Sequence, residues 1–387
     1  MKKRIVAVIL TAAVLVLTMA GFSSAAEIPL DGTWPEEPVK IAMEIYDTTD
    51  SAMLADIAYV DYLSQFFNIE LFVSESIGSP EQEHEFVSNC AAAGCKVYYA
   101  AYNTTSDALV DAVTEYGMYY ISPERIYDEK YADNPYYLGG YNVVTGGEQL
   151  GNGWFMIGYE IARSLAKSEC KHAAYCNGAA SFGVELFKDI QEGFFAGIDA
   201  ARKDGYEIAF DPAVDVIEGF PGTDEFASRM SQVLSGDYDG IGISFSAMEV
   251  WIQPIIDAGK AGQVKIAGLG NISDSMIGVA EMGMLAGLVY QCEEFSFGNM
   301  IPIALNAVTG HSDFIKGDEG CLSLDAELWL IDNEEDLKEI YEKHQAGEYY
   351  MTGEDVASLL VELNPELTRE DFIEYFKSKS LENCLAR

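Results

Sequence analysis

The sequence predicts an α/β protein made of two similar lobes, each with a mostly parallel sheet flanked by helices. Three observations lead to this prediction. The chain has 387 residues, which is enough for two domains, and 49% of them are apolar, which is enough for a buried core. From Pro38 onward, short β-branched and aromatic runs alternate with longer amphipathic stretches, the pattern of repeated strand–helix units. This alternation occurs in two successive series.

The first series predicts strands at residues 39–47, 69–76, 96–102 and 118–124. Helices are expected at 51–67, from the Ser79-Pro80-Glu81 start, where proline suits a first helical turn, and from Ser106. A short strand near 136–144 then leads into a long helix over about 148–168.

The second series predicts strands at 172–178, 206–212, 240–245, 264–270 and 285–291, with helices at 184–203, 223–234, 247–259 and 275–282. Another helix is expected at 297–309. The alternating segment at 322–332 predicts either an antiparallel strand or one that crosses between the lobes. Residues 334–387 are acidic with interspersed Lys and Arg, which predicts a solvated helical surface.

The N-terminus has the pattern of a secretory signal peptide. Lys2, Lys3 and Arg4 precede an apolar run, and small residues end the segment at Ser24-Ala25-Ala26. We expect residues 1–26 to be cleaved off and the protein to act outside the cytoplasm. The alternative is an uncleaved membrane anchor, although such an anchor needs closer to 20 apolar residues.

The charge balance excludes some classes of partner. The chain has 63 acidic and 23 basic residues, a formal charge of −40, and removal of the signal peptide with its three basic residues lowers it to −43. Nucleic-acid binding draws on Lys and Arg to displace counterions from phosphates, so no nucleic-acid partner is expected. An anionic membrane surface is disfavoured for the same reason.

Motifs of catalysis and cofactor binding are weak. GLGNIS (268–273) lacks the last glycine of a dinucleotide fingerprint, and GAASFG (178–183) is followed by Val184 and Glu185 where a phosphate loop needs Lys and Ser or Thr. The four histidines are scattered and no cysteines have a two-residue spacing, so no metal site is predicted. We therefore expect neither an enzyme nor a cofactor. Cys90/Cys95 and Cys170/Cys176 could form disulfides or remain buried thiols.

Candidate ligand-binding residues follow the predicted strands. Ligand crevices of open α/β sheets lie beyond the carboxyl ends of the parallel strands. Carboxylates accept hydrogen bonds from hydroxyl groups, amides and cations donate to hydroxyl oxygens, and aromatic rings cover apolar faces, so this mixture suits a polyhydroxylated ligand. The candidates are Tyr46, Asp47, Asp50, Glu124, Arg125, Phe182, Lys188, Phe245, Asn271 and Gln291.

Four local motifs carry a resemblance to a known family. They are GMYYISPER (117–125), QEGFFAGI (191–198), KIAGLGN (265–271) and LAGLVYQ (285–291). With the architecture, they make the chain from about residue 39 to 333 similar to type 1 periplasmic binding proteins of the ribose/galactose-binding family, the solute receptors of ABC sugar importers.

The resemblance implies residue roles. It gives Glu124 and Arg125 a ligand-binding role, puts Lys188 where the family often has a binding Arg, and makes Gln291 a sugar contact. The sequence departs from the family at Gly270, where a binding Asp is usual and Asn271 is the possible substitute. A second departure is Ala52-Met53, in place of a common aromatic pair.

The resemblance also implies a domain plan. Residues 36–142 with 292–322 would form the N-terminal lobe, and residues 143–291 with 323–387 the C-terminal lobe. The chain would cross between them near 142–147, 291–293 and 320–324. A monomer would capture a small molecule, most simply a sugar, by hinge closure and deliver it to an ABC transporter permease. The alternatives are an extracytoplasmic sensor for a signalling kinase or chemoreceptor, and a secreted α/β enzyme.

Overall fold

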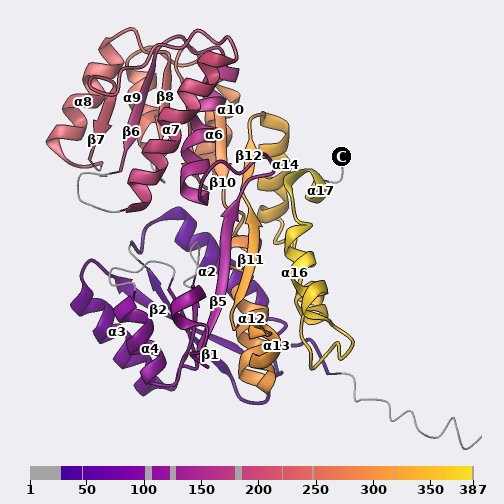
Figure 1. Ribbon diagram of the computed structural model, residues 1–387. Helices are drawn as coiled ribbons and strands as arrows, with labels where there is room; N and C mark the ends of the chain where they lie inside the picture. The colour runs from indigo at the N-terminus through magenta and orange to yellow at the C-terminus, as the bar shows by residue number, and fades with distance from the viewer. Residues whose placement is uncertain are drawn as a thin grey trace, which may run out of the picture.

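The computed structural model describes residues 28–45, 47–100, 107–122, 128–178, 185–219, 221–245, 248–318 and 320–385. The expected signal peptide lies outside these ranges. The described residues form two six-stranded sheets, one in each of two lobes that lie end to end (Figure 1). Among these residues, no helix combines the length and apolar character needed to cross a membrane.

The first sheet is parallel throughout, in the order β11-β5-β4-β3-β1-β2. Its strands are β1 (Val39–Ile45), β2 (Ile69–Ser76), β3 (Val97–Tyr99), β4 (Tyr119–Ser122), β5 (Tyr137–Val144) and β11 (Leu322–Glu327). The helices between the first five strands are α2 (Ser51–Leu63), α3 (Pro80–Ala93), α4 (Asp107–Glu115) and α5 (Asp128–Tyr131).

The second sheet has the order β12-β10-β9-β8-β6-β7, parallel except for β12. Its strands are β6 (Ala173–Asn177), β7 (Val216–Glu218), β8 (Gly240–Ile243), β9 (Lys265–Gly270), β10 (Leu285–Tyr290) and β12 (Trp329–Ile331). Its helices are α6 (Gly153–Lys167), α7 (Glu185–Lys203), α8 (Asp224–Ser235), α9 (Met248–Asp257) and α10 (Asp274–Glu281). These two sheets confirm the predicted α/β class.

In the described part of the chain three segments cross between the sheets, and we call them together the crossover region. They are residues 145–147 after β5, residues 291–293 after β10, and Leu328 between β11 and β12. The segment 322–332 therefore crosses between the sheets, and its last part, β12, pairs antiparallel with β10, so both predicted forms occur in it. The crossing lies at Leu328 and not at 320–324, because β11 pairs with β5 as far as Glu327. The lobe boundary expected at residue 322 thus falls within β11.

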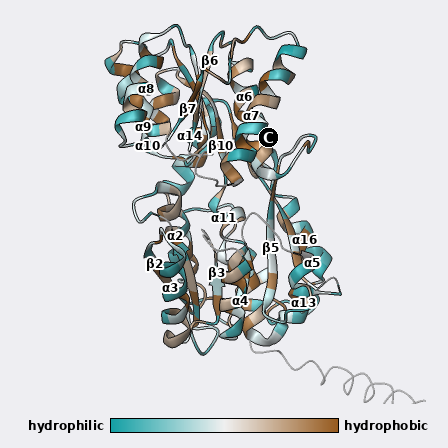
Figure 2. Cartoon of the chain, turned by 60° about the vertical axis from the view of Figure 1, so that its left-hand side comes forward, coloured by the Kyte–Doolittle hydropathy of each residue, from teal (hydrophilic) through white to brown (hydrophobic). Residues whose placement is uncertain are grey.

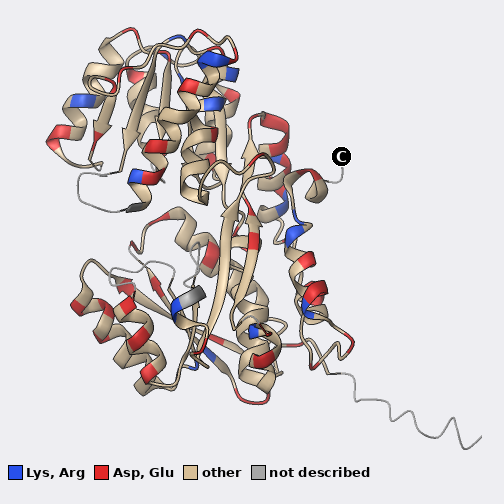
Figure 3. Cartoon of the chain, in the orientation of Figure 1, with Lys and Arg blue, Asp and Glu red and all other residues tan. Residues whose placement is uncertain are grey.

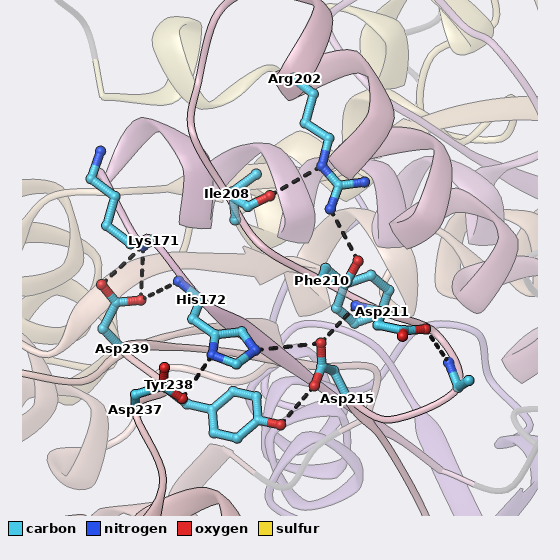
Figure 4. Close-up of polar contacts among 11 residues, drawn as sticks. Lys171, His172, Arg202, Ile208, Phe210, Asp211, Asp215, Asp237, Tyr238 and Asp239 are labelled. Atoms are coloured by element: carbon cyan, nitrogen blue, oxygen red, sulfur yellow. Dashed lines mark hydrogen bonds and ion pairs between the residues drawn. The ribbon is translucent and has the colours of Figure 1, made fainter.

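One predicted strand is wrong. Residues 206–212 make only an isolated bridge, His172 with Ala209, and the edge strand is instead β7. Figure 4 shows what holds the segment: the Arg202 guanidinium donates to the carbonyl oxygens of Ile208 and Phe210, both at 3.0 Å. The Asp215 carboxylate accepts from the Asp211 backbone N–H and turns the chain towards β7. The Arg202 side chain therefore donates to two carbonyl oxygens that would otherwise accept hydrogen bonds from a neighbouring strand.

Glycines bring α6 and α7 into close contact. A Cβ on Gly158 of α6 would lie 1.8 Å from the Ile190 carbonyl oxygen, and a Cβ on Gly193 of α7 would lie 1.8 Å from that of Phe155. Side chains at either position would force the helices apart. The QEGFFAGI motif thus has a packing role in the second lobe.

Hydrophobic strands form the interior of both lobes, and the helices around them carry both hydrophilic and hydrophobic residues (Figure 2). Val39, Ile41 and Met43 of β1 and Ile241 and Ile243 of β8 are all fully buried. Acidic residues are distributed over the outer helices of both lobes and over the C-terminal segment (Figure 3). The negative charge of the chain is therefore spread over its surface, where it favours solubility.

After β10 the chain continues through α11 (Glu293–Ser296), α12 (Met300–Asn306), a π-helical turn (Ala307–His311) and α13 (Ser312–Lys316). The C-terminal segment, which we call the tail, holds α14 (Glu334–Gln345), α15 (Gly353–Ser358), α16 (Arg369–Lys377) and α17 (Leu381–Cys384). The tail is helical, as predicted.

The tail is more than a solvated surface, and it contacts both lobes (Figure 1). Lys338 of α14 pairs with Glu281 of α10 at 2.7 Å on the second lobe. Further on, the Met351 carbonyl oxygen accepts from the Tyr59 hydroxyl at 2.8 Å, and Arg369 donates to the Cys321 carbonyl oxygen at 2.9 Å on the first lobe. Apolar tail residues complete this packing, since Met351, Val356 and Phe372 are fully buried.

Candidate functional site

The carboxyl ends of the parallel strands of the two sheets face one another at the crossover region. Asn271 directly follows β9, and its Nδ2 donates to the Ser51 carbonyl oxygen at the start of α2, at 3.1 Å. Its Oδ1 accepts from the Ile272 backbone N–H at 2.9 Å. One amide side chain therefore ends a strand of the second lobe and joins it to the first.

A cavity of about 60 Å³ lies at this junction, with walls from both lobes. Tyr99 and Phe297 pack edge to face in its wall, with ring centroids 4.5 Å apart. The lining combines aromatic rings with two carboxylates and two amides, and consists of Ala52, Met53, Asp56, Tyr99, Tyr141, Asn271, Gln291, Glu293, Ser296 and Phe297. These groups can accept and donate hydrogen bonds to a polar ligand and can cover its apolar faces.

Two of the candidates named from the sequence line this cavity. Asn271 and Gln291 follow neighbouring strands, β9 and β10, and the parallel pairing of those strands brings their ends together. Ala52 and Met53, at the positions of the family's aromatic pair, line it too. Phe245 instead packs edge to face on Phe187, with centroids 6.2 Å apart.

The other described candidates have local roles or face solvent. Asp47 accepts from the Thr49 backbone N–H and hydroxyl, both at 2.8 Å. Asp50 caps α2 by accepting from the N–H groups of Ala52 and Met53. Lys188 on α7 is exposed. The remaining candidates lie outside the described residues: Tyr46, Glu124, Arg125 and Phe182.

The sequence reasoning missed several lining residues. Tyr99 is the last residue of β3, so the rule that selects strand ends could have included it. Glu293 lies two residues beyond Gln291 and could have been found in the same way. Asp56 lies within α2 and Tyr141 within β5, and only the folded chain brings them to the cavity.

Behind the cavity wall, a half-buried histidine bridges two buried glutamates. His344 of α14 places Nδ1 3.3 Å from Glu293 Oε1 and Nε2 3.1 Å from Glu294 Oε1. We call these three residues the Glu–His–Glu cluster. Glu294 is fully buried and also accepts from the Cys292 thiol at 2.7 Å and from the Tyr350 backbone N–H at 3.0 Å. The Tyr290 hydroxyl donates to Glu293.

Burial and mutual charge shift the pKa values of this cluster. Burial, together with the Glu294 charge, raises the pKa of Glu293 to about 7. Burial also raises the pKa of Glu294, but hydrogen bonds and charge from His344 outweigh it, so the net pKa of Glu294 is lowered. Burial alone would lower the pKa of His344, yet its two carboxylate partners raise it overall. Both ring nitrogens thus face acceptors, as in an imidazolium.

The cluster's ligand-type atoms all lie within 4.8 Å of one another, a spacing that a metal ion could also span. Because each ring nitrogen of His344 already has a carboxylate partner, N–H donors on the ring explain the arrangement of the three side chains without a metal ion. The described residues contain no disulfide: all seven cysteines, including Cys90 and Cys95, are thiols.

No family model matches the chain, and no curated protein does. Solved structures do match. A solute-binding protein from Actinobacillus succinogenes, crystallised with D-allose, has a TM-score of 0.58 at 16% identity, over 78% of this chain and all of its own. A galactofuranose-binding protein has a TM-score of 0.60 at 14% identity, over 81% of this chain and all of its own.

The transcription regulator CcpA of Lactococcus lactis also matches, with a TM-score of 0.53 at 15% identity, over 77% of this chain and all of its own. Regulators and transport receptors thus share this arrangement. In each of these matches about a fifth of this chain lies outside the shared fold. The two sheets, their strand order and these matches give the chain the type 1 periplasmic binding protein fold.

Proposed function

We propose that the protein is an exported receptor that binds a small polyhydroxylated solute, a sugar or polyol, between its lobes and delivers it to an ABC importer. The observation that carries the proposal is the cavity at the facing strand ends, lined from both lobes and spanned by the Asn271–Ser51 hydrogen bond. Two neighbours in fold are described as binding D-allose and galactofuranose, which favours this ligand class.

The size of the cavity indicates how the ligand would enter. Sites for small organic ligands usually measure about 300–1,000 Å³, far more than the roughly 60 Å³ enclosed here. The proposal therefore includes a hinge motion at the crossover region that opens the cavity, after which ligand contacts with both lobes stabilise a closed state.

The signal-peptide pattern at residues 1–26 supports export, and the surface charge supports a soluble monomer. The mature protein would begin near Glu27. Mass spectrometry of protein recovered from the extracytoplasmic fraction would test this, and an intact N-terminus in a membrane fraction would favour an anchor.

The direct test is thermal unfolding of residues 27–387 with a panel of sugars and polyols, including D-allose, myo-inositol and D-arabinose. A ligand at 100 times its Kd stabilises the folded state by about 2.7 kcal/mol, so the matching solute should raise the melting temperature by several degrees. A panel that leaves the melting temperature unchanged throughout would contradict a sugar or polyol receptor.

A substitution at the lobe junction gives a second test. Asn271→Ala removes an amide from the cavity wall and the hydrogen bond to Ser51, so we expect affinity for the matching solute to fall about tenfold or more. Asn383→Ala is the matched control, because the Asn383 amide donates to the Ser378 carbonyl oxygen at 2.7 Å on the tail surface. Equal affinities of the two variants, measured by calorimetry, would place the ligand elsewhere.

A further inference from the structure

We infer that His344, which the tail contributes, is a positioning residue for the ligand cavity: it holds Glu293 in the cavity wall and sets the charge that Glu293 presents there. The part of this inference that concerns ligand affinity rests on the proposed function. The part that concerns the position and charge of Glu293 does not.

Geometry carries the first step. Glu293 lines the cavity and is 6% exposed, and its Oε1 lies 3.3 Å from His344 Nδ1. The imidazole reaches this place because α14 packs beside the crossover region, 50 residues farther along the chain than Glu294. The His344 ring also packs at a tilt against the Tyr349 ring, with centroids 5.3 Å apart. The tail thus places a basic group directly behind a carboxylate of the cavity.

The second step concerns the other titratable groups around His344, which come from several helices and strands packed against it. Acidic groups dominate, and Lys343 is the basic group that opposes protonation of the ring. The titratable groups that face the cluster are Tyr290 of β10, Cys292 before α11, Lys343 of α14, Tyr349 and Tyr350 after it, Tyr59 and Tyr62 of α2, Tyr375 of α16 and Cys384 of α17. Asp56 of α2 lines the same cavity as Glu293.

These tyrosine and cysteine pKa values are raised, chiefly by burial, so the groups stay neutral near pH 7. The variable charges of the cluster are therefore those of its own three members. While Glu293 is protonated, the charges of an imidazolium at His344 and an ionised Glu294 sum to zero. Above pH 7 Glu293 ionises, and its carboxylate then accepts more strongly from ligand hydroxyl groups.

The first experiment needs no ligand. The ring of His344 is titrated by NMR in the mature wild-type protein and assigned by elimination with Gln variants of His84, His172 and His311. We expect a pKa above the ordinary histidine value of about 6.5. Hydrogen exchange of His344→Gln should then be at least tenfold faster than wild type at the Tyr350 amide and over residues 290–297. His311→Gln, which alters a surface pair with Glu362, should leave this region unchanged.

A His344 ring that titrates at or below 6.5, or unchanged exchange in His344→Gln, would overturn the inference whether or not a sugar binds. Because the titration uses the wild-type protein, it still decides the matter if His344→Gln does not fold.

The second experiment measures affinity for the sugar identified by the thermal panel, or for D-allose, from pH 5.5 to 8.5. Wild type should show a change in affinity centred near pH 7, Glu293→Gln should abolish it, and His344→Gln should move its midpoint up by at least one pH unit. An identical pH profile in wild type and Glu293→Gln would overturn the coupling to the ligand. Absence of binding by any sugar in all forms, with the NMR result as expected, would refute the proposed function alone.

Discussion

His344 in the crossover region and His172 at the amino end of β6 each lie between two carboxylates. His172 has Nδ1 3.0 Å from Asp237 Oδ1 and Nε2 3.5 Å from Asp215 Oδ2 (Figure 4). The distances resemble those at His344, but the surroundings differ. Only one partner of His172 is buried, since the Asp215 side chain is 4% exposed and that of Asp237 is 89% exposed. Both partners of His344 are buried, with the side chains of Glu293 and Glu294 7% and 0% exposed.

This difference decides what each histidine contributes. An exposed ion pair is screened by water and stabilises a protein by about 0–1 kcal/mol. Asp215 keeps other partners without His172, because it accepts from the Tyr238 hydroxyl and the Asp211 N–H. Removal of His344 would leave two buried carboxylates facing each other without their shared cation, which is strongly destabilising. His172 and His344 thus make similar contacts but contribute differently to the stability of the fold.

The largest expected effect is that of His344→Gln on stability at pH 7. Loss of one partner from a buried ion pair costs about 3–5 kcal/mol, and we expect a loss of this size in the free energy of unfolding in urea. His311→Gln, at the surface pair with Glu362, should change it by less than about 1 kcal/mol. A loss for His344→Gln no larger than that for His172→Gln would break the distinction between the two sites.

The pH dependence of stability should be the next largest effect. The folded pKa of Glu293 is raised to about 7, so its ionisation destabilises the fold as pH rises through that value. The folded pKa of His344 is also raised, so its contribution is present below about 6.5 and is lost as pH rises through the folded value. The ionisation of Glu293 and the deprotonation of His344 both lower the stability as pH rises. The free energy of unfolding of the wild type should therefore fall by roughly 1–2 kcal/mol between pH 6 and 8.

Urea unfolding at a series of pH values checks this fall. Glu293→Gln should flatten the profile, since the amide does not ionise, while His172→Gln should keep it. A wild-type stability that rises from pH 6 to 8 would show that other groups dominate and that the cluster does not control this range.

The smallest effect is expected for His172→Gln itself. Because Asp237 is solvated and Asp215 retains two partners, the free energy of unfolding should fall by about 1 kcal/mol or less. A larger loss would mean that the imidazole, which stacks on Tyr238 at a centroid distance of 4.1 Å, has a packing role that its ion pairs do not reveal.

Local patterns predicted most of the fold because apolar strands bounded by turns carry their own signal. The segment 322–332 shows the limit of such patterns. Its alternation indicated either an antiparallel strand or a crossing, but the place of the crossing depends on how far β11 pairs with β5, which is a long-range property. Residues 206–212 have strand-like composition, and the Arg202 side chain nevertheless holds them out of the sheet.

The site was less predictable for a related reason. Asn271 and Gln291 could be found because both follow strands that end at one edge. His344 gave no such signal, since it lies in a charged tail helix, and neither its neighbours in sequence nor its spacing from Glu293 indicates a shared buried cluster. Only the folded tail brings the two together.

The tail also bears on when this protein can fold. Tyr59 lies near the start of the first lobe, and the residue that accepts its hydroxyl hydrogen, Met351, is 292 positions later. The first lobe is therefore completed late, because part of its packing waits for the tail. Contacts so distant in sequence form slowly. A chain cut before Met351 would therefore leave the hydroxyl group of the fully buried Tyr59 without its acceptor.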